Sequence, residues 1–344
     1  MGTRPMITGI TRTCSGNLTA TRSDRESCRG IRPEYAEQPA RVAASKPRRS
    51  WVTGMILSAL AAAAPGGFAQ LPAEVSPAPA KTAPPTLFII GDSTVRNGNG
   101  TGQGGQWGWG DFIAPYFDPD KIRIVNAALG GTSSRTFYRD RWPGVKAGIK
   151  AGDFLLLQFG HNDASPVNET EAGPSARSRG TLPGIGSETR SITNVLTGRF
   201  EVVHTFGWYE EQFIRETRAL GATPIVCSLI PRNRWSGEQV VRDSETYAGW
   251  AGDVAARLEA PFLDLNGIIA GHYEALGKEK VDPLFVPGAG PHTSRAGAQT
   301  NALCVVNALG VLKINPLEDY LSGKGKAVIP ASMGLPKQDE RIDP

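Results

Sequence analysis

Five short apolar segments constrain the fold of this chain more than any other feature. They are bounded by Gly, Pro or charged residues and lie at 86–90, 123–128, 153–159, 223–229 and 261–265. Continuous apolar runs of this length are typical of strands that are buried on both faces of a sheet. Helical patterns separate or follow them, at 109–117, 138–149, 204–220, 243–258 and 294–310. This alternation predicts an α/β fold, a three-layer sandwich in which helices flank a five-stranded parallel sheet.

The N-terminal part of the chain has a different composition and is interpreted as a leader over residues 1–69. Within it, Lys46, Arg48 and Arg49 precede an apolar run at 52–64, and small residues lead up to a cleavage position after Ala69. This order is typical of a secretory signal peptide, here at 46–69, and predicts export to the periplasm or the exterior. A run of 13 residues is shorter than the ~20 that a membrane-spanning helix needs. A mis-assigned start codon or a disordered extension would explain residues 1–45 equally well.

The rest of the chain divides by composition into a linker, one domain and a tail. Residues 70–85 are rich in Pro and Ala and are typical of a linker. The β–α alternation extends over 86–315, which we expect to form the folded domain. Residues 164–203 interrupt it with a segment rich in Gly, Pro, Ser and Thr, which we interpret as an insertion that covers substrate. Residues 316–344 are predicted to be a C-terminal tail.

The charge of the domain argues against a nucleic-acid partner. The whole chain carries a net charge of +4, but residues 1–69 contain 10 Lys or Arg and 4 Asp or Glu, a charge of +6. The remainder therefore carries +4 − 6 = −2, which gives no electrostatic basis for binding nucleic acid. No segment approaches the ~20 apolar residues of a membrane span, so we expect no stable membrane association.

The cysteine and histidine residues do not form a metal-binding pattern. Two of the four cysteines fall in the leader, and Cys227 and Cys304 lie 77 residues apart in the domain. None of the four histidines belongs to an H-E-x-x-H motif, so neither a metal nor another cofactor is expected. Cys227 lies in an apolar run and is interpreted as a buried strand thiol, with a Cys227–Cys304 disulfide as the alternative.

Residues suited to acyl-transfer chemistry follow three of the predicted strands and precede the last predicted helix. Ser93 follows the first strand within Gly-Asp-Ser, a Gly-Gly pair follows the second, and Asn162 follows the third within Gly-His-Asn-Asp. His292 precedes the helix at 294–310. Each residue alone has an ordinary explanation as a turn, a helix cap or a surface histidine. Together they supply a serine nucleophile, a general base and N–H donors for an oxyanion.

These four segments, in this order, resemble the conserved blocks of the SGNH (GDSL) hydrolase family. The resemblance implies a flavodoxin-like α/β sandwich in which Ser93 is the nucleophile and His292 the base. It also implies an oxyanion hole formed by Ser93, Gly131 and Asn162, with Gly130 as a near alternative to Gly131.

Further segments resemble one branch of that family, the rhamnogalacturonan acetylesterases. They lie at 91–95, 131–137, 231–235, 262–266, 292–294 and 297–298. The resemblance implies a metal-free carboxylic ester hydrolase, an acetylesterase that removes O-acetyl groups from a polysaccharide or oligosaccharide outside the cell, most specifically pectic rhamnogalacturonan. Alternatives are an esterase for another acetylated glycan or small ester, and a weakly active or inactive carbohydrate-binding protein on the same fold. Candidate contacts with a sugar ring or a uronate carboxylate are Trp107, Trp109, Arg232 and Trp235.

One position departs from the family pattern. The family has an acid three residues before the base histidine, and here that residue is Ala289. Such an acid orients the imidazole and stabilises its charged form, so the orienting group of His292 is left open. A backbone carbonyl can replace it, giving a Ser–His dyad. An acid from elsewhere can take the place, such as Asp282 or one from the insertion. The third hypothesis is a weakened enzyme or a sugar-binding relic.

Overall fold

The computed structural model describes residues 83–169 and 177–329, so the predicted signal peptide and most of the predicted linker lie outside the described residues. It confirms the α/β sandwich with a five-stranded parallel sheet. The strands are β1 (Thr86–Gly91), β2 (Arg123–Asn126), β3 (Phe154–Gln158), β6 (Thr223–Cys227) and β9 (Phe262–Leu263). Their order in the sheet is β2-β1-β3-β6-β9, and all four pairings are parallel. The chain crosses from one side of β1 to the other, so the strand order reverses between β1 and β3.

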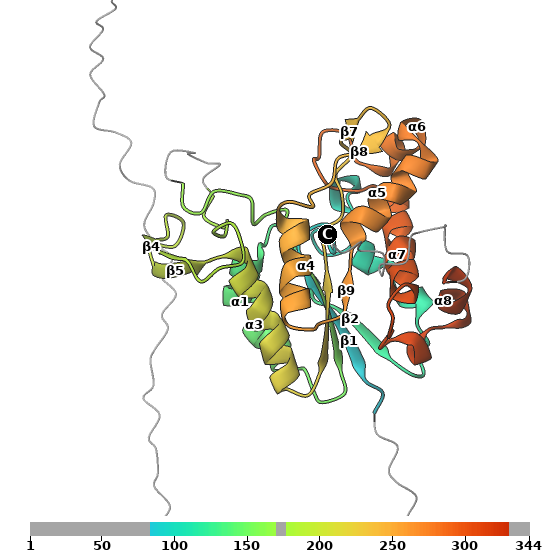
Figure 1. The fold of residues 1–344 in the computed structure, drawn as a ribbon, viewed down its shortest axis with the longest axis horizontal. Coiled ribbons are helices and arrows are strands. Elements are labelled where there is room, and N and C mark those ends of the chain that lie inside the picture. Colours follow the sequence, from blue (N-terminus) through green and yellow to red (C-terminus); the bar gives the residue numbers. More distant parts are fainter. Residues whose placement is uncertain (1–82, 170–176, 330–344) are drawn as a thin grey trace, which may run out of the picture. The chain divides into compact units, whose positions relative to one another are not determined.

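Helices cover both faces of the sheet (Figure 1), and a hydrophobic core lies on each face. Side chains alternate along β1, so that Leu87 and Ile89 face one core and Phe88 and Ile90 the other. The first core is closed by α5 (Leu265–Leu276) and α7 (Arg295–Gly310). The second is closed by α1 (Ser134–Asp140), α2 (Trp142–Lys146), α3 (Phe206–Ala219) and α4 (Tyr247–Arg257).

Several predicted helices differ from the observed ones for local reasons. The segment 109–117 forms only two single 3₁₀ turns, Trp109–Asp111 and Ala114–Tyr116, because Gly110 and a proline interrupt it. The segment at 138–149 is displaced, since a capping box at Ser133 starts α1 earlier. Helix α5 was not predicted. It begins where Asp264 accepts a hydrogen bond from the Gly267 N–H directly after β9.

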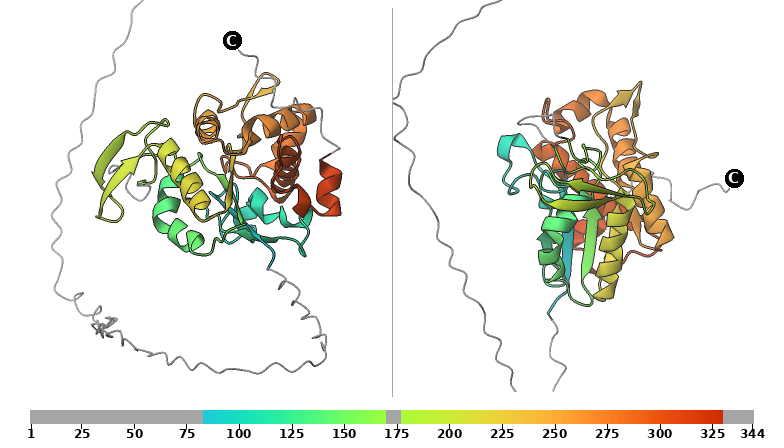
Figure 2. Two further views of the ribbon diagram at one scale, coloured as in Figure 1. Left: turned by 60° about the horizontal axis from the view of Figure 1, so that its bottom comes forward. Right: turned by 90° about the vertical axis from the view of Figure 1, so that its left-hand side faces the viewer.

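The segment interpreted as an insertion contains its own small sheet. Strands β4 (Thr189–Thr193) and β5 (Phe200–His204) form an antiparallel hairpin. Figure 2 shows this hairpin at the end of the domain away from α7 and α8. A second hairpin joins β7 (Trp235–Ser236) and β8 (Gln239–Val240), and α6 (Lys278–Val281) precedes the segment that carries His292.

The packed structure continues beyond the domain end predicted at residue 315. Leu317 is fully buried and Leu321 is 2% exposed, and both belong to the first core. They are followed by α8 (Gly323–Val328). The Pro, Gly and Lys content of this region suggested a tail, but two leucines four residues apart are enough to attach it to the domain.

The structure also tests the predictions about the two domain cysteines and about membrane-spanning helices. Cys227 and Cys304 are both free and buried, so the alternative of a disulfide between them is wrong. In the described parts of the chain, no helix has both the length and the apolar character needed to cross a membrane.

Replacing Leu317 by Ala is expected to lower the free energy of unfolding by about 2–4 kcal/mol, because it removes a fully buried side chain from the core. Chemical denaturation of the purified domain measures this loss. Ile314→Ala is the matched control, since Ile314 is 80% exposed, and it should change stability by less than about 0.5 kcal/mol. Equal stability of both variants would show that residues after 315 do not contribute to the core.

Candidate active site

Ser93 and His292 meet at the carboxyl ends of the strands although they are 199 residues apart. Ser93 Oγ lies 2.8 Å from His292 Nε2, in a part-buried contact. Ser93 follows β1 in a tight turn, and His292 lies two residues before Ser294, whose hydroxyl caps α7. The Thr293 carbonyl accepts a 3.0 Å hydrogen bond from the Trp107 N–H, which joins the histidine segment to the loop after Ser93. The two predicted catalytic side chains therefore form one pair.

A buried polar network fixes the turn that carries Ser93. Asp92 Oδ1 accepts hydrogen bonds from the Thr94 N–H and the Thr94 hydroxyl, both at 2.8 Å. Thr94 in turn accepts from Gln158 at the end of β3, and Gln158 accepts from the Trp109 indole. Burial raises the pKa of Asp92 to about 6 against these hydrogen bonds. Trp109 is fully buried in this network, so it is not available to a sugar ring.

The Gly130-Gly131 turn, which carries one predicted oxyanion donor, lies beside the same serine, and Asn162 is bonded to the residue that follows this turn. A Cβ atom placed on Gly130 would lie 3.4 Å from the Ser93 Cβ, so the Gly-Gly turn is in contact with the serine. Gly131 has a φ of 83°, a left-handed conformation that favours glycine. Among the described residues, no hydrogen bond uses the N–H of Ser93 or Gly131. Asn162 donates one amide proton to the Thr132 carbonyl at 2.8 Å, which fixes the amide and leaves its second proton available.

The surroundings of His292 favour its neutral form. Burial lowers the pKa of His292 below its ordinary value, the backbone of Ala289 raises it through a hydrogen bond, and the charge of Arg232 lowers it. A hydrogen bond that raises the pKa of an imidazole is accepted by the partner, so the Ala289 group is its carbonyl. The Asp282 carboxylate instead pairs with Lys278 at 2.8 Å and with Asn233 at 2.9 Å. The backbone N–H of His292 also donates to the Ala289 carbonyl, at 3.4 Å.

Two neighbours of Asn162 are buried, and one of them, Asp163, joins two loops. Asp163 accepts hydrogen bonds from the Ser134 N–H and hydroxyl and from the Gly160 N–H, which joins the end of β3 to the start of α1. Burial raises the pKa of Asp163 to about 7 despite the Ser134 hydrogen bonds. His161 is 7% exposed, and burial together with the charge of Arg232 lowers its pKa to about 3, so it is neutral.

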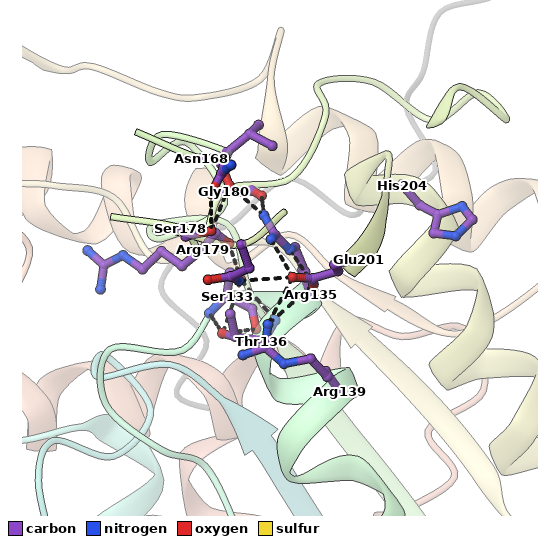
Figure 3. A network of polar contacts seen from close by, with 12 residues as sticks. Ser133, Arg135, Thr136, Arg139, Asn168, Ser178, Arg179, Gly180, Glu201 and His204 are labelled. Carbon is purple, nitrogen blue, oxygen red and sulfur yellow. Dashed lines mark hydrogen bonds and ion pairs between the residues drawn. The ribbon is translucent and has the colours of Figure 1, made fainter. Parts of the chain in front are cut away.

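The sequence did not predict a buried guanidinium that attaches the β4–β5 hairpin to the site (Figure 3). The Arg135 side chain has no exposed surface. Its Nε and Nη2 donate to the two carboxylate oxygens of Glu201, each at 2.8 Å. Its Nη1 donates to the carbonyls of Val167 and Gly180, at 2.8 and 2.7 Å. One side chain thus connects β5, Val167 and Gly180 to α1.

A second arginine, Arg179, lies next to Gly180 and connects this part of the chain to the turn at Gly131. Ser133 donates from its hydroxyl to the Arg179 carbonyl at 2.5 Å. The Arg179 guanidinium donates to the Gly131 carbonyl at 2.9 Å and to the Ser165 hydroxyl at 3.1 Å. These contacts restrain the peptide of the predicted oxyanion glycine. Neither arginine has a motif that reveals its partners, because the partners lie 14 to 66 residues away in the sequence.

Within residues 83–169 and 177–329, no group of three or more His, Cys, Asp or Glu side chains is placed to hold a metal ion.

Comparison with known proteins identifies the class as ester hydrolases. Residues 89–299, more than half of the chain, match the GDSL-like lipase/acylhydrolase family. The chain therefore belongs to this family, and the predictions of an SGNH fold and of a carboxylic ester hydrolase are confirmed.

The relatives define the branch. A rhamnogalacturonan acetylesterase of Emericella nidulans is 30% identical over 225 residues, covering 65% of this chain and 84% of that protein. The rhamnogalacturonan acetylesterase RhgT of Bacillus subtilis is 28% identical over 259 residues, covering 71% and 97%. The predicted resemblance to the rhamnogalacturonan acetylesterase branch is thus confirmed. The crystal structure of the Bacillus subtilis protein YxiM has a TM-score of 0.52 and 25% identity, covering 66% of this chain and 56% of that longer one.

Glu201→Gln is expected to lower stability in a pH-dependent way. Burial opposes ionisation of Glu201, but hydrogen bonds from Arg135 and Asn194 lower its pKa from 4.5 to about 2. The stabilisation by the ionised carboxylate is therefore complete above about pH 5 and is lost as the pH falls toward 2. The difference in unfolding free energy between wild type and Glu201→Gln should shrink over that range.

Denaturant unfolding at a series of pH values measures this difference. Glu188→Gln is the matched control, because Glu188 is an exposed glutamate without an ion pair in the described structure. A Glu201→Gln effect that stays constant down to pH 2 would contradict the ion-pair explanation.

Proposed function

We propose that this protein is a serine esterase that removes O-acetyl groups from an acetylated polysaccharide, with pectic rhamnogalacturonan as its substrate. The observation that carries the proposal is the 2.8 Å contact between Ser93 Oγ and His292 Nε2 beside unused N–H donors. The named activity of the relatives from Emericella nidulans and Bacillus subtilis supports the choice of substrate.

Acylation begins when His292 Nε2 takes the proton of Ser93 Oγ and the oxygen attacks the acetyl carbonyl carbon. The negative charge that develops on the carbonyl oxygen is stabilised by the N–H groups of Ser93 and Gly131 and by the free amide proton of Asn162. His292 then returns the proton to the departing sugar oxygen, leaving an acetylated Ser93. Water then gives a proton to the same imidazole as its oxygen attacks the acetyl carbonyl. The bond to Ser93 Oγ breaks, acetate leaves, and His292 returns the proton to Ser93 Oγ.

His292 must be held with Nε2 toward the serine for this sequence to work. In the proposed dyad, the Ala289 carbonyl accepts the proton on Nδ1 and so sets the tautomer and the ring orientation. A carbonyl orients the ring as an acid does, but it carries no negative charge to stabilise the imidazolium that forms during acylation.

An acetylated pectic polymer lies outside the cell, so the proposed substrate requires export of the protein. Residues 46–69 are proposed to be the signal peptide that directs it.

Ser93→Ala is expected to abolish acetate release from p-nitrophenyl acetate and from acetylated rhamnogalacturonan, because it removes the attacking oxygen. Acetate release by purified Gln70–Pro344 measures turnover, and the circular dichroism spectrum verifies folding. Acetylated xylan tests another acetylated glycan as substrate. Thr132→Ala, an alteration of a neighbouring hydroxyl that faces the Leu129 carbonyl, is the control and should keep most turnover. Full activity of Ser93→Ala would refute the nucleophile.

Ala289→Asp is expected to raise kcat about 10-fold or more, because a carboxylate beside Nδ1 stabilises the imidazolium. It should also raise the pKa of His292, which burial now keeps below 6.5, so the acidic limb of the pH–rate profile should move to higher pH. The pH dependence of kcat/KM measures both effects.

Ala296→Asp is the control for an added charge, since Ala296 is exposed at the start of α7. An identical profile for wild type and Ala289→Asp would show that this position does not face the base.

A further inference from the structure

A tight turn at residues 97–100 lies directly beside the nucleophile. A Cβ atom placed on Gly130 would lie 3.4 Å from the Ser93 Cβ. The same atom would lie 3.4 Å from Asn97 Oδ1 and 3.3 Å from the Gly98 nitrogen. Polar atoms of this turn and the nucleophilic serine therefore lie against the same glycine, although no step of the proposed reaction uses them.

Hydrogen bonds on both sides of the turn hold it in this position. The Gly100 N–H donates to the Asn97 carbonyl at 2.9 Å and closes the turn. The Asn97 side chain donates from Nδ2 to Gln106 Oε1 at 2.8 Å, and Arg96 donates to the Asn99 carbonyl at 3.0 Å. The Asn97 amide is thus held before a substrate arrives, so a ligand that binds to it pays little conformational entropy.

Two polar groups of this turn are unused. Asn97 Oδ1 and the Gly98 N–H make no hydrogen bond with any described residue. Gly98 has a φ of 53°, and the hydrogen bond of such a turn joins its first and fourth residues, which leaves the N–H of the second one free. Asn97 is half-buried, and its Oδ1 keeps some exposed surface. An acceptor beside a donor is complementary to a hydroxyl group, which both accepts and donates.

The chemistry of the reacting ester determines which part of it suits this turn. The acetyl group ends in a methyl, which gains nothing from polar atoms and would remove them from water at a cost. The other side of the ester is a sugar ring that carries hydroxyl groups. When the carbonyl carbon lies at Ser93 Oγ, the hydroxyl on the neighbouring ring carbon is the polar group closest to the ester.

We propose that Asn97 Oδ1 and the Gly98 N–H bind the free hydroxyl next to the acetylated oxygen, so that the enzyme selects esters of vicinal diols in which only one oxygen is acetylated. A substrate whose second oxygen is blocked leaves both groups of the turn unpaired, which lowers its transition-state binding. This inference rests on the proposed esterase function, and it assigns a specificity-determining residue, Asn97, to that site.

The test compares 2-hydroxyethyl acetate with 2-methoxyethyl acetate. Both release acetate, but only the first has a free hydroxyl on the carbon next to the ester. The ratio of their alkaline hydrolysis rates gives the intrinsic difference in reactivity. Relative to that ratio, wild type should prefer the hydroxy ester in kcat/KM by about 10-fold.

Asn97→Ala should lower this preference about 5- to 10-fold, because only the Gly98 N–H then remains to bind the hydroxyl. Its kcat/KM on the methoxy ester should stay within about 3-fold of wild type, which also verifies that the variant is folded. A wild-type preference no greater than that of alkaline hydrolysis, or an unchanged preference in Asn97→Ala, would overturn the proposal.

Asn99→Ala is the matched control, and it should leave the preference unchanged. Asn99 is an exposed asparagine of the same turn, and Arg96 binds its backbone carbonyl, which the substitution retains. A loss of preference in Asn99→Ala as large as that in Asn97→Ala would assign the effect to the shape of the turn and would also overturn the proposal.

A binding measurement separates this proposal from the esterase proposal. Unacetylated rhamnogalacturonan oligosaccharide should bind Ser93→Ala in a calorimetric titration, and Ser93→Ala/Asn97→Ala should bind it about 5-fold more weakly. If wild type releases no acetate from any ester while this difference in affinity persists, the esterase function fails and the hydroxyl site stands. Equal affinity of the two variants would overturn the hydroxyl site.

Discussion

The parallel pairing of β1 with β2 on one side and β3 on the other determines where every other part of the site can lie. Because the three strands point the same way, the turns that carry Ser93, Gly131 and Asn162 all emerge at one edge of the sheet. The reversal of strand order between β1 and β3 opens that edge, since the connections leave it in opposite directions. His292 is added from the start of α7 through the hydrogen bonds of Thr293 with Trp107.

The parts of the fold and site that could be predicted are those that depend on residues close together in the sequence. Buried parallel strands require uninterrupted apolar runs such as Leu155–Leu157, and the residue that follows such a strand is at the functional edge by topology alone. Ser93, Gly131 and Asn162 could therefore be placed at this edge before their contacts were known, whereas His292, which precedes a helix, could be assigned only from the resemblance to the SGNH family. Leu317 and Leu321 could not, because two leucines in a Pro- and Gly-rich segment give no periodicity until they are seen against the core.

The contacts that hold the site in shape could not be predicted because they join distant segments without a motif. The Arg135–Glu201 pair spans 66 residues, and a buried ion pair of this kind is weak evidence for stability in general. Here its geometry gives it a definite role. Arg135 donates hydrogen bonds to two carbonyls as well as to the Glu201 carboxylate. These bonds connect β5 and Gly180 to α1. Arg179 lies next to Gly180, and its guanidinium donates to the Gly131 carbonyl, so the same segment also contacts the Gly131 turn.

The electrostatics of His292 reflect the absence of an acid at position 289. Burial and the charge of Arg232 lower the pKa of His292, and the hydrogen bond with the backbone of Ala289 raises it without adding a negative charge. A neutral base is ready to accept a proton even at mildly acidic pH, but the imidazolium that follows is poorly stabilised. Within this chain, an acid three residues before His292 is the group that would supply the missing negative charge, and Ala289 stands there instead.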